Sequence, residues 1–204
     1  MRFLLDSHRY FEERSDVPFF QGLVAVFMNG GITFLTTIVT LIWLAAAGGD
    51  NIARVIETVG LTMFVYTFFS SFITWFLMAI VFYLFILWDG IGRMEFFSML
   101  SMAGLGFVPL MFASAIEFAA TMYFASQIPA DGVATTTHVL IGGEFGVIPA
   151  IVMIIVHTIM LLWSGHVWIG GVHQLGGVSP GKSTAAVILI ILVLWLETVA
   201  LALF

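Results

Sequence analysis

Charge is scarce in this 204-residue sequence, and cysteine is absent from it. Only 9% of the residues are charged, whereas a soluble domain carries about 25%. A chain with so few charged groups cannot cover its surface with them, so it needs lipid as its solvent. The absence of cysteine excludes disulfides, thiol nucleophiles and cysteine-ligated zinc. Six Lys and Arg residues against twelve Asp and Glu residues, a net charge of −6, argue against nucleic acid as a partner.

Apolar residues make up 61% of the chain, and the mean hydropathy is +1.14. A helix needs about 20 apolar residues to cross a bilayer. Five segments meet this requirement, and we expect them to cross: 22–47, 59–88, 96–127, 147–169 and 184–204. The connections are expected to be a loop, a tight turn, a connector without Lys or Arg, and a polar corner, over 48–57, 89–95, 128–146 and 170–182. The sequence therefore predicts an all-α bundle of five transmembrane helices, a domain over 22–204 that follows an N-terminal segment over 1–21.

The N-terminal segment has an amphipathic pattern. Its large apolar side chains share one arc of a helical wheel: Phe3, Leu4, Tyr10 and Phe11. Arg9, Glu12 and Glu13 lie opposite this arc. The pattern predicts a short interfacial helix on the membrane surface, and a frayed polar terminus remains the alternative. The apolar run that follows is longer than the core of about 7–15 residues in a cleavable signal, so we expect it to be retained.

The basic residues predict the orientation of the chain. Positively charged side chains near span ends stay in the cytoplasm. With a cytoplasmic N-terminus, the inner side holds five cations, namely Arg2, Arg9, Arg14, Arg93 and Lys182, and the outer side holds Arg54 alone. Five spans then leave the C-terminus outside. We expect a multi-pass protein of the cell membrane.

The third apolar segment, 96–127, is too long for one straight crossing. Gly104, Gly106 and Pro109 lie a third of the way along it. Proline removes a helical hydrogen bond and clashes with the preceding turn, so we expect a kink at Pro109. The first part of the segment should run obliquely and the second part more steeply.

Three ionisable residues lie at membrane depth, Glu117, His157 and Glu197, with His166 nearer the inner surface. Counting about 1.5 Å per residue puts all three in one layer, about 10–15 Å from the outer ends of their spans. Ionisable groups in hydrocarbon usually face the bundle interior or a wet cavity. We expect Glu117 or Glu197 to pair with His157, either as a structural clasp or as a relay for protons or ions. A third alternative is that they make no mutual contact.

The polar corner matches the phosphate-binding pattern G-x-x-x-x-G-K-S over 176–183. That pattern binds nucleotides when it follows a strand and opens a helix, and here an apolar membrane segment precedes it. We expect an inter-helix connection, in which Gly170, Gly171, Gly176 and Gly177 end one helix, Ser179 caps the next and Pro180 begins it. His173 lies seven residues after His166, with no carboxylate at ligand spacing, so neither a metal nor another cofactor is expected.

Tryptophans often anchor helices at the membrane–water boundary. Four of them lie near the expected span ends: Trp43, Trp88, Trp163 and Trp168. We expect them to serve as such anchors.

Three local patterns carry a resemblance to a known family. They are the start Asp16-Val17-Pro18-Phe19-Phe20, the run from Glu95-Phe96-Phe97 through Gly104 to Pro109-Leu110, and the corner from Gly170 to Lys182. Together they resemble the YIP family of five-span membrane proteins, named for interacting with Rab-type GTPases. Eukaryotic members carry a longer N-terminal region, so the resemblance implies a prokaryotic, archaeal-type member that works in trafficking or membrane shaping.

Two classes of function remain open from the sequence. One is a non-enzymatic membrane organiser or adaptor that works through its cytoplasmic face on the bilayer and on a cytoplasmic protein. The other is a small channel, transporter or lipid-translocating protein that uses Glu117, His157 and Glu197. No residue indicates a catalytic nucleophile. The small-residue face at Gly30 and Gly31 suits either packing within the bundle or a homo-oligomer.

Overall fold

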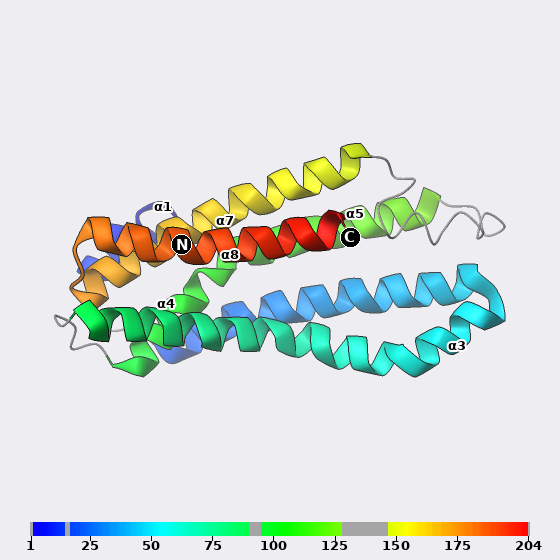
Figure 1. Cartoon of the computed structure of the whole chain (residues 1–204), viewed down its shortest axis with the longest axis horizontal. Helices are drawn as coiled ribbons and strands as arrows, with labels where there is room; N and C mark the ends of the chain where they lie inside the picture. Colours follow the sequence, from blue (N-terminus) through cyan, green and yellow to red (C-terminus); the bar gives the residue numbers. More distant parts are fainter. Residues whose placement is uncertain (1, 15–16, 90–94, 128–146, 204) are drawn as a thin grey trace.

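Long helices lying lengthwise beside one another make up the computed structural model of this chain (Figure 1). It describes residues 2–14, 17–89, 95–127 and 147–203. The expected connector over 128–146 and most of the turn over 89–95 lie outside these ranges. Five stretches are long and apolar enough to cross a membrane: Phe19–Trp43, Gly60–Asp89, Phe96–Tyr123, Ile151–Gly176 and Pro180–Val199. The predicted all-helical fold with five membrane helices is confirmed.

The first two spans form one helix, α3 (Phe19–Asp89), of 71 residues. A straight helix of this length would extend about 105 Å, far more than a bilayer, and Figure 1 shows α3 doubling back so that its halves lie side by side. The prediction of a loop over 48–57 was wrong, because the backbone stays helical through the bend. Gly48 and Gly49 lie within this helical stretch. A helical glycine costs only about 1 kcal/mol relative to alanine, which the surrounding helix tolerates.

The third span consists of two helices, α4 (Phe96–Leu105) and α5 (Phe107–Gln127), which meet at Gly106 (Figure 1). Pro109 lies within the first turn of α5 and has no N–H to donate to the carbonyl of Leu105. The helical ladder is therefore interrupted one turn before the proline. The carbonyl of Ala103, in the last turn of α4, instead accepts a hydrogen bond from the indole of Trp168 at 3.0 Å.

The N-terminal segment forms α1 (Arg2–Leu5) and α2 (Ser7–Glu12), which is capped by the side chain of Asp6. Its apolar arc faces protein, contrary to the expectation that it lies on lipid: Leu4 and Phe11 are buried in the core. The hydroxyl of Ser7 donates to the carbonyl of His166 at 2.9 Å. A methyl group at Gly170 would lie 2.5 Å from that hydroxyl. The glycine therefore lets α2 dock closely against α7 (Val147–Gly176).

Helix α7 continues past Gly170 and Gly171 to Gly176, so the prediction that the first two glycines end the helix was wrong. They serve close packing instead: a side chain at Gly171 would overlap that of Met102. The chain turns only at Gly177, whose φ of 65° lies in the left-handed region that glycine tolerates best. Helix α8 (Pro180–Leu203) follows directly.

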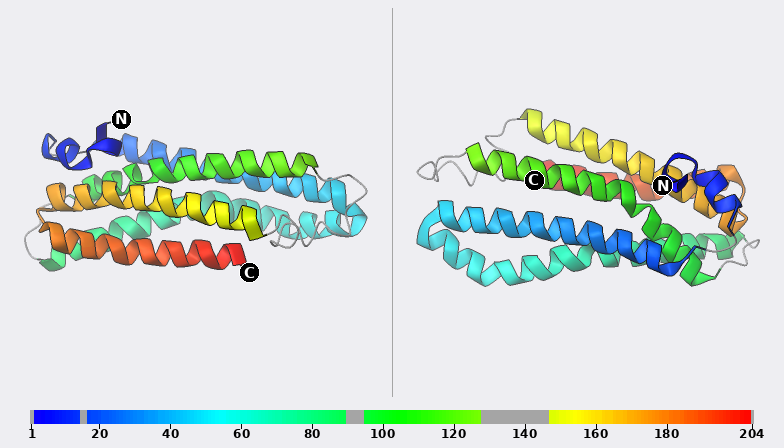
Figure 2. Two further views of the ribbon diagram at one scale, coloured as in Figure 1. Left: turned by 90° about the horizontal axis from the view of Figure 1, so that it is seen from above. Right: turned by 180° about the vertical axis from the view of Figure 1, so that it is seen from behind.

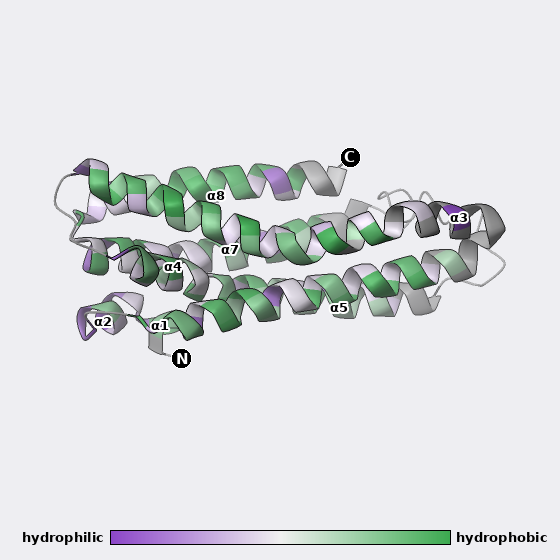
Figure 3. Cartoon of the chain, turned by 90° about the horizontal axis from the view of Figure 1, so that it is seen from below, coloured by the Kyte–Doolittle hydropathy of each residue, from purple (hydrophilic) through white to green (hydrophobic). Residues whose placement is uncertain are grey.

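The apolar core is concentrated at one end of the bundle, which we call the folded end. It comprises α1, α2, α4, the first and last turns of α3, the start of α5, the last turns of α7 and the start of α8 (Figures 1 and 2). Trp168 is fully buried here, so its expected role as a boundary anchor was wrong, whereas Trp88 is exposed. Elsewhere the spans show many exposed apolar side chains, and Figure 3 shows hydrophobic residues along their length. Such surfaces suit lipid.

Helices α3 and α4 cross in direct backbone contact at Gly22 and Gly104. A methyl group at Gly104 would lie 2.6 Å from Cα of Gly22, and one at Gly22 would overlap the carbonyl oxygen of Ser101. The hydroxyl of Ser101 donates to the carbonyl of Pro18 at 2.7 Å beside this crossing. Close approach of small residues is a main source of helix association in membranes.

We predict that Gly104→Ala lowers the free energy of unfolding by about 1–3 kcal/mol, because the added methyl group forces the two backbones apart. Gly31→Ala is the matched control, since a methyl group there would meet nothing within 4 Å. It should be neutral or stabilising by about 0.5–1 kcal/mol through helix propensity. Thermal unfolding in detergent micelles measures both. Equal effects at the two positions would contradict the close backbone contact between α3 and α4 at Gly104.

Candidate functional site

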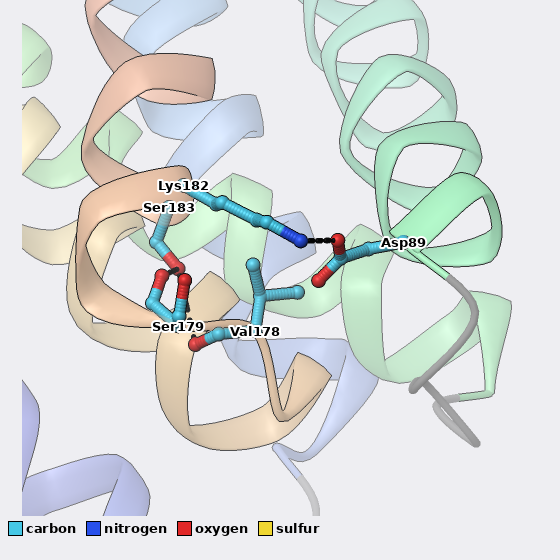
Figure 4. Close-up of polar contacts among 5 residues, drawn as sticks. All are labelled: Asp89, Val178, Ser179, Lys182 and Ser183. Carbon is cyan, nitrogen blue, oxygen red and sulfur yellow. Dashed lines mark hydrogen bonds and ion pairs between the residues drawn. The ribbon is translucent and has the colours of Figure 1, made fainter.

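The corner between α7 and α8 is held by contacts within the chain (Figure 4). Lys182 forms an ion pair with Asp89, the last residue of α3. Ser183 donates its hydroxyl to the carbonyl of Ser179 at 3.1 Å. The segment that resembles a phosphate-binding loop follows a helix rather than a strand, and its lysine is already paired. The geometry is that of a helix–helix connection tied to the second span.

The same corner is joined to α2 by a group of polar side chains. His173 donates from Nδ1 to the carbonyl of Val178 at 2.6 Å. Its ring lies 5.0 Å, centroid to centroid, from that of His8. The amide of Gln174 donates to Nδ1 of His8 at 2.6 Å. Residues far apart in the sequence therefore share one surface at the folded end.

The predicted intramembrane polar layer is only partly brought together. Glu117 on α5 and His157 on α7 lie near each other, but no hydrogen bond or ion pair joins their side chains within the described residues. The side chain of Glu197 is exposed on α8, with no hydrogen bond or ion pair to either within the described residues. His166 is also exposed, and it contributes only its carbonyl, to Ser7.

A buried hydrogen-bonded cluster, which the sequence reading missed, lies beside this layer. Asn29 donates to the hydroxyl of Ser71 at 3.3 Å and accepts from that of Ser114 at 3.1 Å. The hydroxyl of Thr33 donates to that of Ser114 at 3.4 Å. The cluster ties both halves of α3 to α5, and Ser114 precedes Glu117 by one turn. The available signal was Asn29 itself, the one asparagine within the apolar run 22–47.

Next to this polar region, the interior of the folded end is mainly apolar. The side chains there are buried and contain no ionisable group: Val26, Phe82, Met102, Phe107, Val167 and Trp168. The rings of Phe82 and Trp168 lie 6.1 Å apart. The described part of the bundle is therefore closed toward the folded end.

Five apolar spans, a kinked third span and a packed corner define a multi-pass integral membrane protein. Residues 2–202 match the family described as the Yip1 domain, and the chain belongs to this family. Its members are generally non-enzymatic membrane proteins. A search of curated proteins and a search of solved structures found no match to the chain.

The buried cluster gives a testable coupling. We predict that Asn29→Ala and Ser114→Ala are non-additive in unfolding free energy, with a coupling of about 0.6 kcal/mol and at most about 1.7 kcal/mol, as for other interhelical hydrogen bonds in membranes. Thr36 serves as the control partner, because its hydroxyl bonds within its own helix, to Ile32. A cycle between Thr36→Ala and Ser114→Ala should be additive. Additivity in both cycles would show that no interhelical hydrogen bond couples Asn29 and Ser114.

Proposed function

We propose that this protein is a non-enzymatic organiser of the cell membrane, which shapes the bilayer and recruits a cytoplasmic protein through its folded end. The observation that carries the proposal is that the two ends of the helix bundle differ in structure. Helices α1, α2 and α4 all lie at the folded end, beside the ends of the spans (Figure 2). At the opposite end, the bend of α3 joins the first two spans directly.

Additional helices at one membrane boundary take up area in one leaflet. Such asymmetry favours bending of the bilayer, as with interfacial amphipathic helices. The apolar packing of α1 and α2 onto α7 holds this extra volume in place.

A cytoplasmic location of the folded end supports the recruiting role. Arg9, Arg14 and Lys182 lie at this end, whereas Arg54 lies between the first two spans, where α3 bends. Basic residues near span ends favour the cytoplasm. Arg9 and Lys182 are both well exposed there, and each is paired with a carboxylate, Glu13 and Asp89 respectively.

We predict that the purified protein, reconstituted at increasing density, lowers the mean diameter of liposomes seen by electron cryomicroscopy. Deletion of residues 1–12 removes α1 and α2 and should weaken the effect. Arg9→Gln is the control, because it breaks only the exposed pair with Glu13. Diameters independent of protein density would refute membrane shaping, and thermal unfolding checks that the deletion variant is folded.

Transport is the second candidate, favoured by the position of Glu117 one turn from Ser114, a member of the buried Asn29 cluster. The apolar closure toward the folded end opposes it. We therefore predict that proton and ion fluxes into liposomes match those of empty liposomes, and that Glu117→Gln and His157→Ala leave them unchanged. A flux above background that both variants abolish would favour transport. A pull-down with the folded end as bait tests the recruiting role separately.

A further inference from the structure

Asp89 is an anomalous residue at the folded end. Its side chain is only 9% exposed, although it stands at the last position of α3. One carboxylate oxygen, Oδ1, pairs with the ammonium group of Lys182. The other, Oδ2, is buried and has no hydrogen-bond partner in the described part of the chain.

A structural tie alone does not explain this arrangement. A buried carboxylate normally has hydrogen-bond donors on both oxygens, because burial removes the water that would otherwise supply them. Negative charge at the C-terminal end of a helix is also disfavoured by the helix dipole. The site therefore has capacity for one more donor or positive charge than the described part of the chain provides.

Asp89 and Lys182 line a hollow between the end of α3 and the start of α8, together with Phe85, Trp88 and Ala185. Trp88 is 87% exposed, and the side chain of Lys182 is 58% exposed. All five residues belong to the ends of membrane-length helices. The hollow thus combines a carboxylate, an ammonium group and an aromatic surface at the level where a span leaves the bilayer.

We propose that this hollow binds the headgroup of a lipid with a primary amine, of the phosphatidylethanolamine type. The lipid ammonium group donates to Oδ2 of Asp89, which has no other partner within the described residues, and the lipid phosphate accepts from the ammonium group of Lys182. Lysine suits this arrangement, because its ammonium group has three N–H donors and can hold the phosphate while it stays paired with Oδ1 of Asp89. Phe85 and Trp88 lie against the glycerol and upper acyl region. The inference depends only on the membrane location of the chain, not on its proposed role.

The chemistry makes a sharp distinction between headgroups. Ethanolamine carries N–H donors, whereas choline has the same charge and none. A phosphatidylglycerol headgroup offers Lys182 a phosphate but offers Asp89 no cation. Only the amine lipid satisfies both residues.

The test is to titrate the delipidated full-length protein in detergent with three lipids that have identical acyl chains and differ only in headgroup. Bound lipid is counted by native mass spectrometry, and the shift in unfolding temperature is recorded alongside. We expect ethanolamine lipid to bind about ten-fold more tightly than choline lipid, the value of one charge-assisted hydrogen bond. Asp89→Asn should abolish this preference, and Lys182→Gln should weaken binding of all three. Arg9→Gln, at the same end, is the control and should change nothing.

The preference of the wild-type protein is decisive even if a variant fails to fold. Equal binding of ethanolamine and choline lipids would overturn the proposal. A preference for the glycerol lipid would also overturn it, since the site would then bind phosphate through Lys182 alone. Soluble glycerophosphoethanolamine serves as a further arm. If it binds as tightly as the whole lipid, the ligand is not a membrane lipid and the proposal fails.

Discussion

The structure depends on close approach between helix backbones that carry no side chain at the point of contact. In lipid, apolar side chains gain nothing by leaving the solvent, so helices associate through packing and hydrogen bonds. Gly22 and Gly104 allow α3 and α4 to touch, and Gly170 allows α2 to rest on α7. Between these contacts, Trp75 and Trp168 donate to carbonyls of α4. The folded end is therefore assembled by small residues and held by indole hydrogen bonds.

This principle separates what the sequence could predict from what it could not. The five spans could be predicted because hydropathy is a property of each segment alone. The helix break near Pro109 could be predicted for the same reason, since proline disrupts the helix that contains it. The role of a glycine depends on what approaches it. The sequence predicts helix ends at Gly170 and Gly171, but both glycines allow close packing inside α7. Gly177 has the left-handed conformation that the corner requires.

The candidate site shows the same limit. Glu117 and His157 were selected because ionisable groups are rare in hydrocarbon, and the structure brings them near each other. Glu197 was placed in the same layer by counting residues, but depth along a helix does not fix its facing, and this side chain is exposed. The cluster of Asn29, Ser71 and Ser114 was missed because uncharged polar residues are common in spans, and their contacts become visible only once the three spans are packed together.

The tryptophans have a practical consequence for spectroscopy. Three indoles at the folded end donate to backbone carbonyls: Trp75 to Leu100, Trp163 to Leu4 and Trp168 to Ala103. Loosening of this end would expose these rings and shift their fluorescence emission to longer wavelength. Trp195 is bonded to Thr158 instead, deep between α7 and α8. Intrinsic emission can thus report on one end of the protein without any added label, once Trp43 and Trp195 are both replaced by phenylalanine.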